Sequence, residues 1–258
     1  MSKLFLISGP CAIEDRDTAF FIAREVKRIC DKLDIRFIFK GSYEKANRSK
    51  LDSFTGIDKS EALNILKEVR DTLGVENITD VHESNEPAEV APYVTHLQIP
   101  AFLCRQTKLL IAAGETGCTV NIKKGQFLSP EAMQFALDKV RSAGNDKVWA
   151  CERGTTFGYN DLVVDATSVF RMKKLGAPVV MDCTHSVQRP NQTSGVTGGD
   201  PEYIETIARS AVATGADGLF MEVHPEPHKA LSDPHTMLQL DKLEGILEKC
   251  VKIRNAIN

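Results

Sequence analysis

Positively charged and hydrogen-bonding side chains cluster after one apolar run near the start of the chain. The run ends at Lys40, and four more such residues follow within nine positions: Lys45, Asn47, Arg48 and Ser49. Ammonium and guanidinium groups this close repel one another unless a phosphate or carboxylate shares them. The spacing therefore indicates an anion site, and a solvated surface loop is the alternative for such a cluster taken alone.

A second group combines soft and hard metal ligands: Cys11, His185, Glu222 and Asp233. One thiolate, one imidazole and two carboxylates suit Zn²⁺, Fe²⁺, Mn²⁺ or Co²⁺. These residues lie far apart in the sequence, so only a fold that joins its first and last elements could assemble them. The residues alone leave two alternatives open, a small buried hydrophobe for Cys11 and a hydrogen-bonded loop residue for His185.

Composition restricts the class of protein that carries these groups. The 258 residues are 42% hydrophobic with a net charge of −3, which argues against a nucleic-acid partner or an anionic membrane surface. The first residues hold only a short apolar run, below the length of a signal-peptide core or membrane span. Seven cysteines without a Cys-x-x-Cys pair fit reduced thiols. We expect a cytoplasmic protein.

The elements that must position these groups alternate between β-prone and helical segments. The expected strands are Leu4–Ser8, Arg36–Lys40, Asn77–Val81, His96–Ile99, Thr119–Lys123, Val148–Glu152, Val179–Asp182 and Gly218–Val223. The expected helices are Thr18–Leu33, Lys59–Leu73, Glu86–Ala91, Lys108–Thr116, Pro130–Ala143, Leu162–Leu175, Pro201–Thr214 and Asp241–Ala256. Ser129 and Asp200 are expected to cap the helices that begin at the prolines following them.

Eight such units without a linker predict a single-domain α/β fold, a (β/α)₈ TIM barrel over residues 1–258. A doubly wound open sheet is the alternative, but no Gly-x-Gly-x-x-Gly follows the first strand. In a barrel the chemistry gathers at the carboxyl ends of the strands, and every expected strand ends in polar or ionisable groups.

The alternation of side chains along a strand predicts which of these strand-end groups point into the barrel. Lys123 is expected to point inward and Lys124 into solvent. An inward Glu222 would need a cation or another partner. Six cations belong to the strand ends and their loops, enough for two anionic groups: Lys40, Lys45, Arg48, Arg105, Lys123 and Arg153. Taken alone, Arg105 and Arg153 could instead be ion-pair partners of glutamates.

Longer motifs extend along nearly the whole chain. They are Lys45-Ala-Asn-Arg-Ser49, Ile99-Pro-Ala-Phe-Leu-Cys-Arg-Gln106, Asn121-Ile-Lys-Lys-Gly-Gln-Phe127, Glu152-Arg-Gly-Thr-Thr-Phe-Gly-Tyr159, Asp182-Cys-Thr-His-Ser-Val187 and Gly218-Leu-Phe-Met-Glu-Val-His-Pro-Glu-Pro227, followed by Ala230-Leu-Ser-Asp233. In these motifs the chain resembles the 3-deoxy-D-manno-octulosonate 8-phosphate (KDO 8-phosphate) synthase family. The resemblance implies a homotetrameric barrel enzyme, a transferase that condenses phosphoenolpyruvate with D-arabinose 5-phosphate and water, and a product used in lipopolysaccharide biosynthesis.

The resemblance also implies roles for single residues. Phosphoenolpyruvate would be held by Lys40, Lys45, Gln98, Lys123 and Arg153. Arabinose 5-phosphate would be held by Asn47, Arg48 and Ser49, with Arg105 reaching its phosphate from an adjacent subunit. Catalytic roles fall to Lys45, Lys123, His185 and Asp233. The family branch with Cys at the position of Cys11 binds a divalent metal through the residues matching Cys11, His185, Glu222 and Asp233, and all four are present here.

Other functions are weighed against this one. A 3-deoxy-D-arabino-heptulosonate 7-phosphate synthase, which uses erythrose 4-phosphate, typically carries Lys-Pro-Arg-Thr where this chain has Lys45-Ala-Asn-Arg-Ser49. A Schiff-base aldolase would use a lysine as its nucleophile. An inactive sugar-phosphate sensor would lack a ligand or an anion-binding lysine, and none is missing. The polar, Gly-rich segment Gln188–Asp200 is expected to be a mobile loop over the site.

Overall fold

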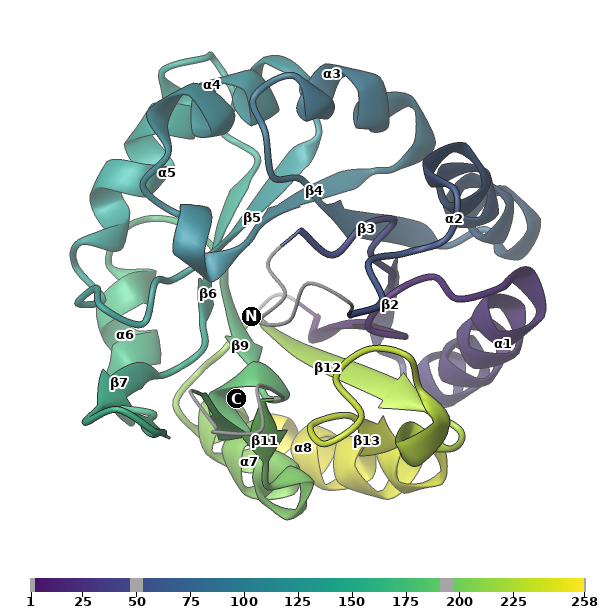
Figure 1. Cartoon of the computed structure of the whole chain (residues 1–258). Coiled ribbons are helices and arrows are strands. Elements are labelled where there is room, and N and C mark those ends of the chain that lie inside the picture. The colour runs from purple at the N-terminus through teal and green to yellow at the C-terminus, as the bar shows by residue number, and fades with distance from the viewer. Residues whose placement is uncertain (1–2, 47–52, 191–196, 258) are drawn as a thin grey trace.

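The parallel strands of the computed structural model, which describes residues 3–46, 53–190 and 197–257, close into a barrel ringed by helices (Figure 1). The eight barrel strands are β1 (Phe5–Gly9), β2 (Arg36–Lys40), β3 (Glu76–Asp80), β4 (His96–Ile99), β5 (Thr119–Lys123), β6 (Val148–Glu152), β9 (Val179–Asp182) and β12 (Gly218–His224). They pair in this order, and β12 pairs with β1 to complete the ring. The predicted (β/α)₈ barrel is confirmed.

The helices follow the strands as the sequence predicts. They are α1 (Arg16–Lys32), α2 (Lys59–Leu73), α3 (Glu86–Val90), α4 (Thr107–Glu115), α5 (Met133–Arg141), α6 (Ser168–Lys173), α7 (Ile204–Ala213) and α8 (Leu243–Ile257). Within the described residues, no helix combines the length and apolarity that crossing a membrane requires. All seven cysteines lie within these residues, and none forms a disulfide.

Two apolar cores follow from the alternation of side chains along the strands. Leu219, Met221 and Val223 of β12 pack in the large core between sheet and helices. Phe220 belongs to the smaller core inside the barrel, and the next inward residue, Glu222, reaches the carboxyl end. The start of the strand is a glycine because a Cβ on Gly218 would lie 2.2 Å from the ring of Phe5.

Two details differ from the sequence-based expectations, and a third agrees with them. The segment expected to begin a helix at Leu162 forms instead a hairpin of β7 (Thr155–Phe157) and β8 (Asp161–Val163), and α6 begins only at Ser168. Ser129 does accept a hydrogen bond from the amide of Ala132 at 3.3 Å, ahead of α5. Asp200 forms no cap, because its carboxylate pairs with Arg189 at 2.8 Å.

Candidate active site

A cavity of about 250 Å³ lies at the carboxyl ends of the barrel strands. This is where sites in this fold are built, because the loops after the strands meet there. Seven of the residues singled out from the sequence line it: Lys40, Lys45, Lys123, Arg153, His185, Glu222 and Asp233. The barrel thus brings four of the six cationic candidates and three of the four metal-ligand candidates to one place.

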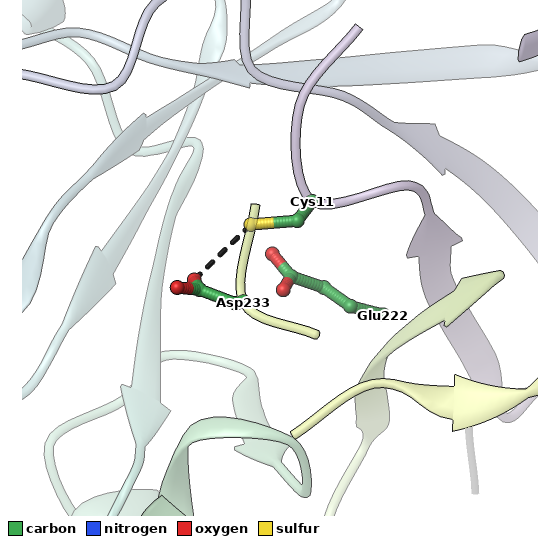
Figure 2. A group of neighbouring side chains, drawn as sticks. All are labelled: Cys11, Glu222 and Asp233. Atoms are coloured by element: carbon green, nitrogen blue, oxygen red, sulfur yellow. Dashed lines mark hydrogen bonds between the residues drawn. The ribbon is translucent and has the colours of Figure 1, made fainter. Parts of the chain in front are cut away.

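Three of the predicted metal ligands lie close together, two of them at the wall of this cavity. Ligand atoms of Cys11, Glu222 and Asp233 all lie within 4.8 Å of one another. Figure 2 shows the three side chains pointing toward a common space, with Cys11 Sγ 3.2 Å from Asp233 Oδ2. Cys11 follows β1, Glu222 lies on β12, and Asp233 lies in the loop after β12, so closure of the barrel assembles the group. Asp233 has a φ of 48°, a left-handed conformation that Asp tolerates better than most residues.

The fourth predicted ligand, His185, lies beside this group. Its Nε2 is 3.6 Å from Glu222 Oε2, and its Nδ1 is 2.9 Å from Asp182 Oδ2. The backbone amide of His185 also donates to Asp182 Oδ1 at 2.8 Å. A carboxylate behind the far nitrogen is the arrangement that orients metal-binding histidines. Asp182 was not predicted as a site residue, although its spacing of three residues from His185 was a usable signal.

The donor atoms suit a divalent cation. Glu222 Oε1 accepts a hydrogen bond from Lys40 Nζ at 2.7 Å, but the buried Oε2 has no hydrogen-bond partner among the described residues. A buried carboxylate oxygen without a partner is costly. Burial, followed by the charges of Asp233 and Glu222, raises the pKa of the Cys11 thiol. A bound cation would counter both effects, since coordination removes the thiol proton and occupies the carboxylate oxygen.

Two of the four cations that line the described part of the cavity, Lys40 and Lys123, are paired with carboxylates. Lys123 Nζ lies 2.8 Å from Asp182 Oδ2 and 3.9 Å from the centre of the Phe220 ring. Burial opposes the charge of Lys123, but Asp182 and other anions outweigh it and raise its pKa. The half-buried Lys45 behaves in the same way: burial is outweighed by the charges of Cys11, Glu222 and other acidic groups, and its pKa is raised.

Arg153 is the cation with the most unused donors. Its side chain is only 4% exposed, and one terminal nitrogen donates to Gln188 Oε1 at 2.8 Å. The buried Nε and Nη1 have no hydrogen-bond partner among the described residues. A guanidinium in this state can offer two N–H groups to one phosphate or carboxylate.

Gln98 is held in a row of polar side chains inside the barrel. It is fully buried. Its Nε2 donates to Asp80 Oδ1 at 2.8 Å, and its Oε1 accepts from Asn121 Nδ2 at 2.9 Å. Asp80 also accepts from Ser42 at 2.5 Å. Burial opposes the charge of Asp80, but Lys40, Lys45 and Lys123 hold its pKa well below the usual range.

The remaining candidates are placed differently. Arg105 is exposed and is not among the residues lining the cavity; its carbonyl oxygen accepts from Lys139 Nζ at 2.9 Å. Asn47, Arg48 and Ser49 lie outside the described residues. The expectation that Lys124 is solvated is wrong, because its side chain is fully buried beside Glu152.

Comparisons with known proteins show which family the chain belongs to. The model of the DAHP synthetase I family matches residues 2–258. The chain is 48% identical over 252 residues to the 2-dehydro-3-deoxyphosphooctonate aldolase of Cyanothece sp. (strain PCC 7425 / ATCC 29141), an alignment that covers 98% of this chain and 92% of the relative. A protein of the same name from Brucella ovis is 50% identical over 248 residues, which cover 96% and 90% of the two chains. Another from Koribacter versatilis is 48% identical over 258 residues, with 99% and 92% covered.

Proposed function

The chain belongs to the DAHP synthetase I family, and we propose that it condenses phosphoenolpyruvate with D-arabinose 5-phosphate and water. The products are 3-deoxy-D-manno-octulosonate 8-phosphate and inorganic phosphate. The relatives' name describes the same eight-carbon product, since a 2-dehydro-octonate is an octulosonate. The observation that carries the proposal is one cavity lined by the buried Arg153 guanidinium and by Glu222 and Asp233, whose carboxylates also lie close to Cys11 Sγ.

The side chains of this cavity have separable tasks in the reaction. Arg153 and Lys45, with Lys40 and Lys123, bind the phosphate and carboxylate of phosphoenolpyruvate and hold it still. The second anion can then approach in attack geometry, because its repulsion from the first is screened. C3 of the enol forms a bond with the aldehyde carbon, water adds at C2, and the C2–O bond to phosphate breaks.

Cys11, His185, Glu222 and Asp233 would hold a divalent ion: Zn²⁺, Fe²⁺, Mn²⁺ or Co²⁺. When bound, such an ion supplies Lewis-acid polarisation or orientation of the aldehyde, or a water of lowered pKa. Asp182 keeps the His185 ring turned so that Nε2 faces Glu222. His185 and Asp233 are also the proposed proton carriers when they are not engaged as ligands.

We also propose an oligomeric state and a cellular compartment for this protein. We expect a homotetramer in which Arg105 reaches the arabinose 5-phosphate of a neighbouring subunit, where Asn47, Arg48 and Ser49 also contact this substrate. Exposed aromatic side chains lie near Arg105 in sequence or beside the cavity, among them Phe102, 60% exposed, and Phe127, 58% exposed. Apolar surface of this kind supports an interface. Seven unpaired cysteines support the cytoplasm as the compartment.

The experiment is a phosphate-release assay with phosphoenolpyruvate and either arabinose 5-phosphate or erythrose 4-phosphate. We expect faster turnover with the five-carbon sugar, and faster turnover with erythrose 4-phosphate would assign the chain to the seven-carbon synthases. Borohydride added during turnover tests for a Schiff base. A trapped covalent adduct would replace this mechanism with a lysine-based one.

A further inference from the structure

Lys124 occupies a closed environment that the reaction does not explain. The residue follows β5, its side chain is fully buried, and it does not line the cavity as its neighbour Lys123 does. Its Nζ lies 3.0 Å from Thr155 Oγ1 and 3.2 Å from the carbonyl oxygen of Gly154. It also lies 3.4 Å from Glu152 Oε1. The ammonium thus joins the end of β6 to the first residue of the β7–β8 hairpin.

Glu152 fixes the turn that these contacts surround. Its Oε1 accepts hydrogen bonds from the backbone amides of Arg153 at 2.9 Å and Gly154 at 2.7 Å. Gly154 has a φ of +86°, a left-handed conformation that favours glycine. One carboxylate oxygen therefore holds two consecutive amides of a sharply turned segment, and Lys124 holds that oxygen in place.

The residue between these two anchors is Arg153. Its backbone amide is bound to Glu152, while its buried guanidinium lines the cavity with two nitrogens unpaired among the described residues. The direction of an arginine side chain depends on the backbone from which it leaves, and displacement of a binding group by about 1 Å is enough to weaken a site. We propose that Glu152, anchored by Lys124, is a positioning residue that aims Arg153 at phosphoenolpyruvate. This inference rests on the proposed function.

The charge of Glu152 and its hydrogen bonds predict opposite effects of its replacement on phosphoenolpyruvate binding. The inference can therefore be tested. A buried carboxylate next to an anion site repels the anion, so replacing it with any neutral residue should strengthen binding if charge alone matters. If the hydrogen bonds to the two amides matter, only a neutral residue with an acceptor oxygen should keep the site intact. Glu152→Gln and Glu152→Met both remove the charge and differ in this acceptor.

The test measures binding of phosphoenolpyruvate to the metal-loaded protein by titration calorimetry, together with KM for each substrate. We expect Glu152→Gln to bind within about twofold of the wild type. We expect Glu152→Met to bind about tenfold or more weakly, as when a partner that orients a binding group is lost. The KM for arabinose 5-phosphate should stay near the wild-type value. Equal or tighter binding by Glu152→Met would overturn the inference.

A second variant tests the anchor and does not depend on the folding of Glu152→Met. The pair Lys124→Met with Glu152→Gln keeps the site neutral and keeps the acceptor, but removes the ammonium that holds it. The double variant and the wild-type Glu152–Lys124 pair have the same net charge. We therefore expect this protein to bind phosphoenolpyruvate several-fold more weakly than the wild type, and binding equal to the wild type would remove Lys124 from the inference. A wild-type protein that neither binds nor turns over phosphoenolpyruvate would instead refute the proposed function.

Discussion

The substitution Gln98→Leu distinguishes two roles of Gln98. The family resemblance makes this residue a contact of phosphoenolpyruvate, whereas its hydrogen bonds make it a structural bridge. In the structure, Gln98 bridges Asp80 and Asn121, which face it across neighbouring strands. Leucine would leave Asp80 Oδ1 without its donor from Gln98 and Asn121 Nδ2 without its acceptor. Each buried group that loses a partner costs about 1–3 kcal/mol. We therefore expect the free energy of unfolding to fall by about 2–5 kcal/mol.

Urea unfolding measures this loss, and steady-state kinetics measures its consequence for the site. Because Asp80 is held near Lys40 and Lys45, which are proposed to bind phosphoenolpyruvate, its displacement should raise KM for this substrate together with the loss of stability. The matched control is Gln134→Leu on α5, where a side-chain bond to Asp138 one turn away is worth about 0.2–0.5 kcal/mol. An unchanged unfolding free energy, combined with a tenfold rise in KM for phosphoenolpyruvate alone, would refute this reasoning and make Gln98 a substrate contact.

Three further predictions concern pH, packing and metal. Burial, opposed by Glu76, lowers the pKa of His96 from 6.5 to about 4. The unfolded chain therefore binds the proton first, and stability that is fully present above pH 6.5 should fall by about 3 kcal/mol as the pH drops to 4. Urea unfolding measured across this pH range checks the prediction. A slope of unfolding free energy against pH that is as steep in His96→Leu as in the wild type would contradict it. Gly218→Ala forces a Cβ against Phe5 and should lower the free energy of unfolding by about 1–3 kcal/mol. Gly245→Ala in α8 meets open space and should raise it by about 0.5–1 kcal/mol. Equal shifts of the two variants in thermal melts would count against the packing argument. Chelation should abolish turnover and lower the melting temperature, and a single divalent ion should restore both; full activity in rigorously metal-free protein would exclude a metal role.

Regular patterns made the barrel predictable. Each barrel strand is a short, largely apolar run that is buried on both faces, and each long helix shows an apolar stripe, so local sequence alone indicates both. The alternation of side chains along β5 correctly predicted that Lys123 points into the barrel, where its Nζ lies over the Phe220 ring. The hairpin β7–β8 escaped prediction because its strands are three residues long and lie largely on the surface, where no apolar period marks them.

Lys124 shows why the site was harder to predict than the fold. Alternation places its side chain away from the barrel interior, and a lysine on that side is ordinarily solvated. Here the side chain is closed in by carbonyl oxygens of Gly125, Leu128 and Gly154 and by Glu152. These partners come from two different loops, and their meeting depends on tertiary structure that no local pattern encodes.

The balance of charge in the cavity links the cationic residues predicted to bind anions with the residues predicted to bind a metal. Four cations line the described part of the cavity: Lys40, Lys45, Lys123 and Arg153. Four carboxylates lie within it or pair with these cations: Asp80, Asp182, Glu222 and Asp233. Their charges cancel, so these side chains alone give little net attraction for two anionic substrates. The additional positive charge must come from a bound cation or from other arginines. Arg105 is one candidate, although it is not among the residues lining the cavity, and Arg48, which lies outside the described residues, is another. The proposed metal site and the proposed anion site are therefore electrostatically coupled, because Glu222, a proposed metal ligand, pairs with Lys40, a proposed phosphoenolpyruvate ligand, at 2.7 Å.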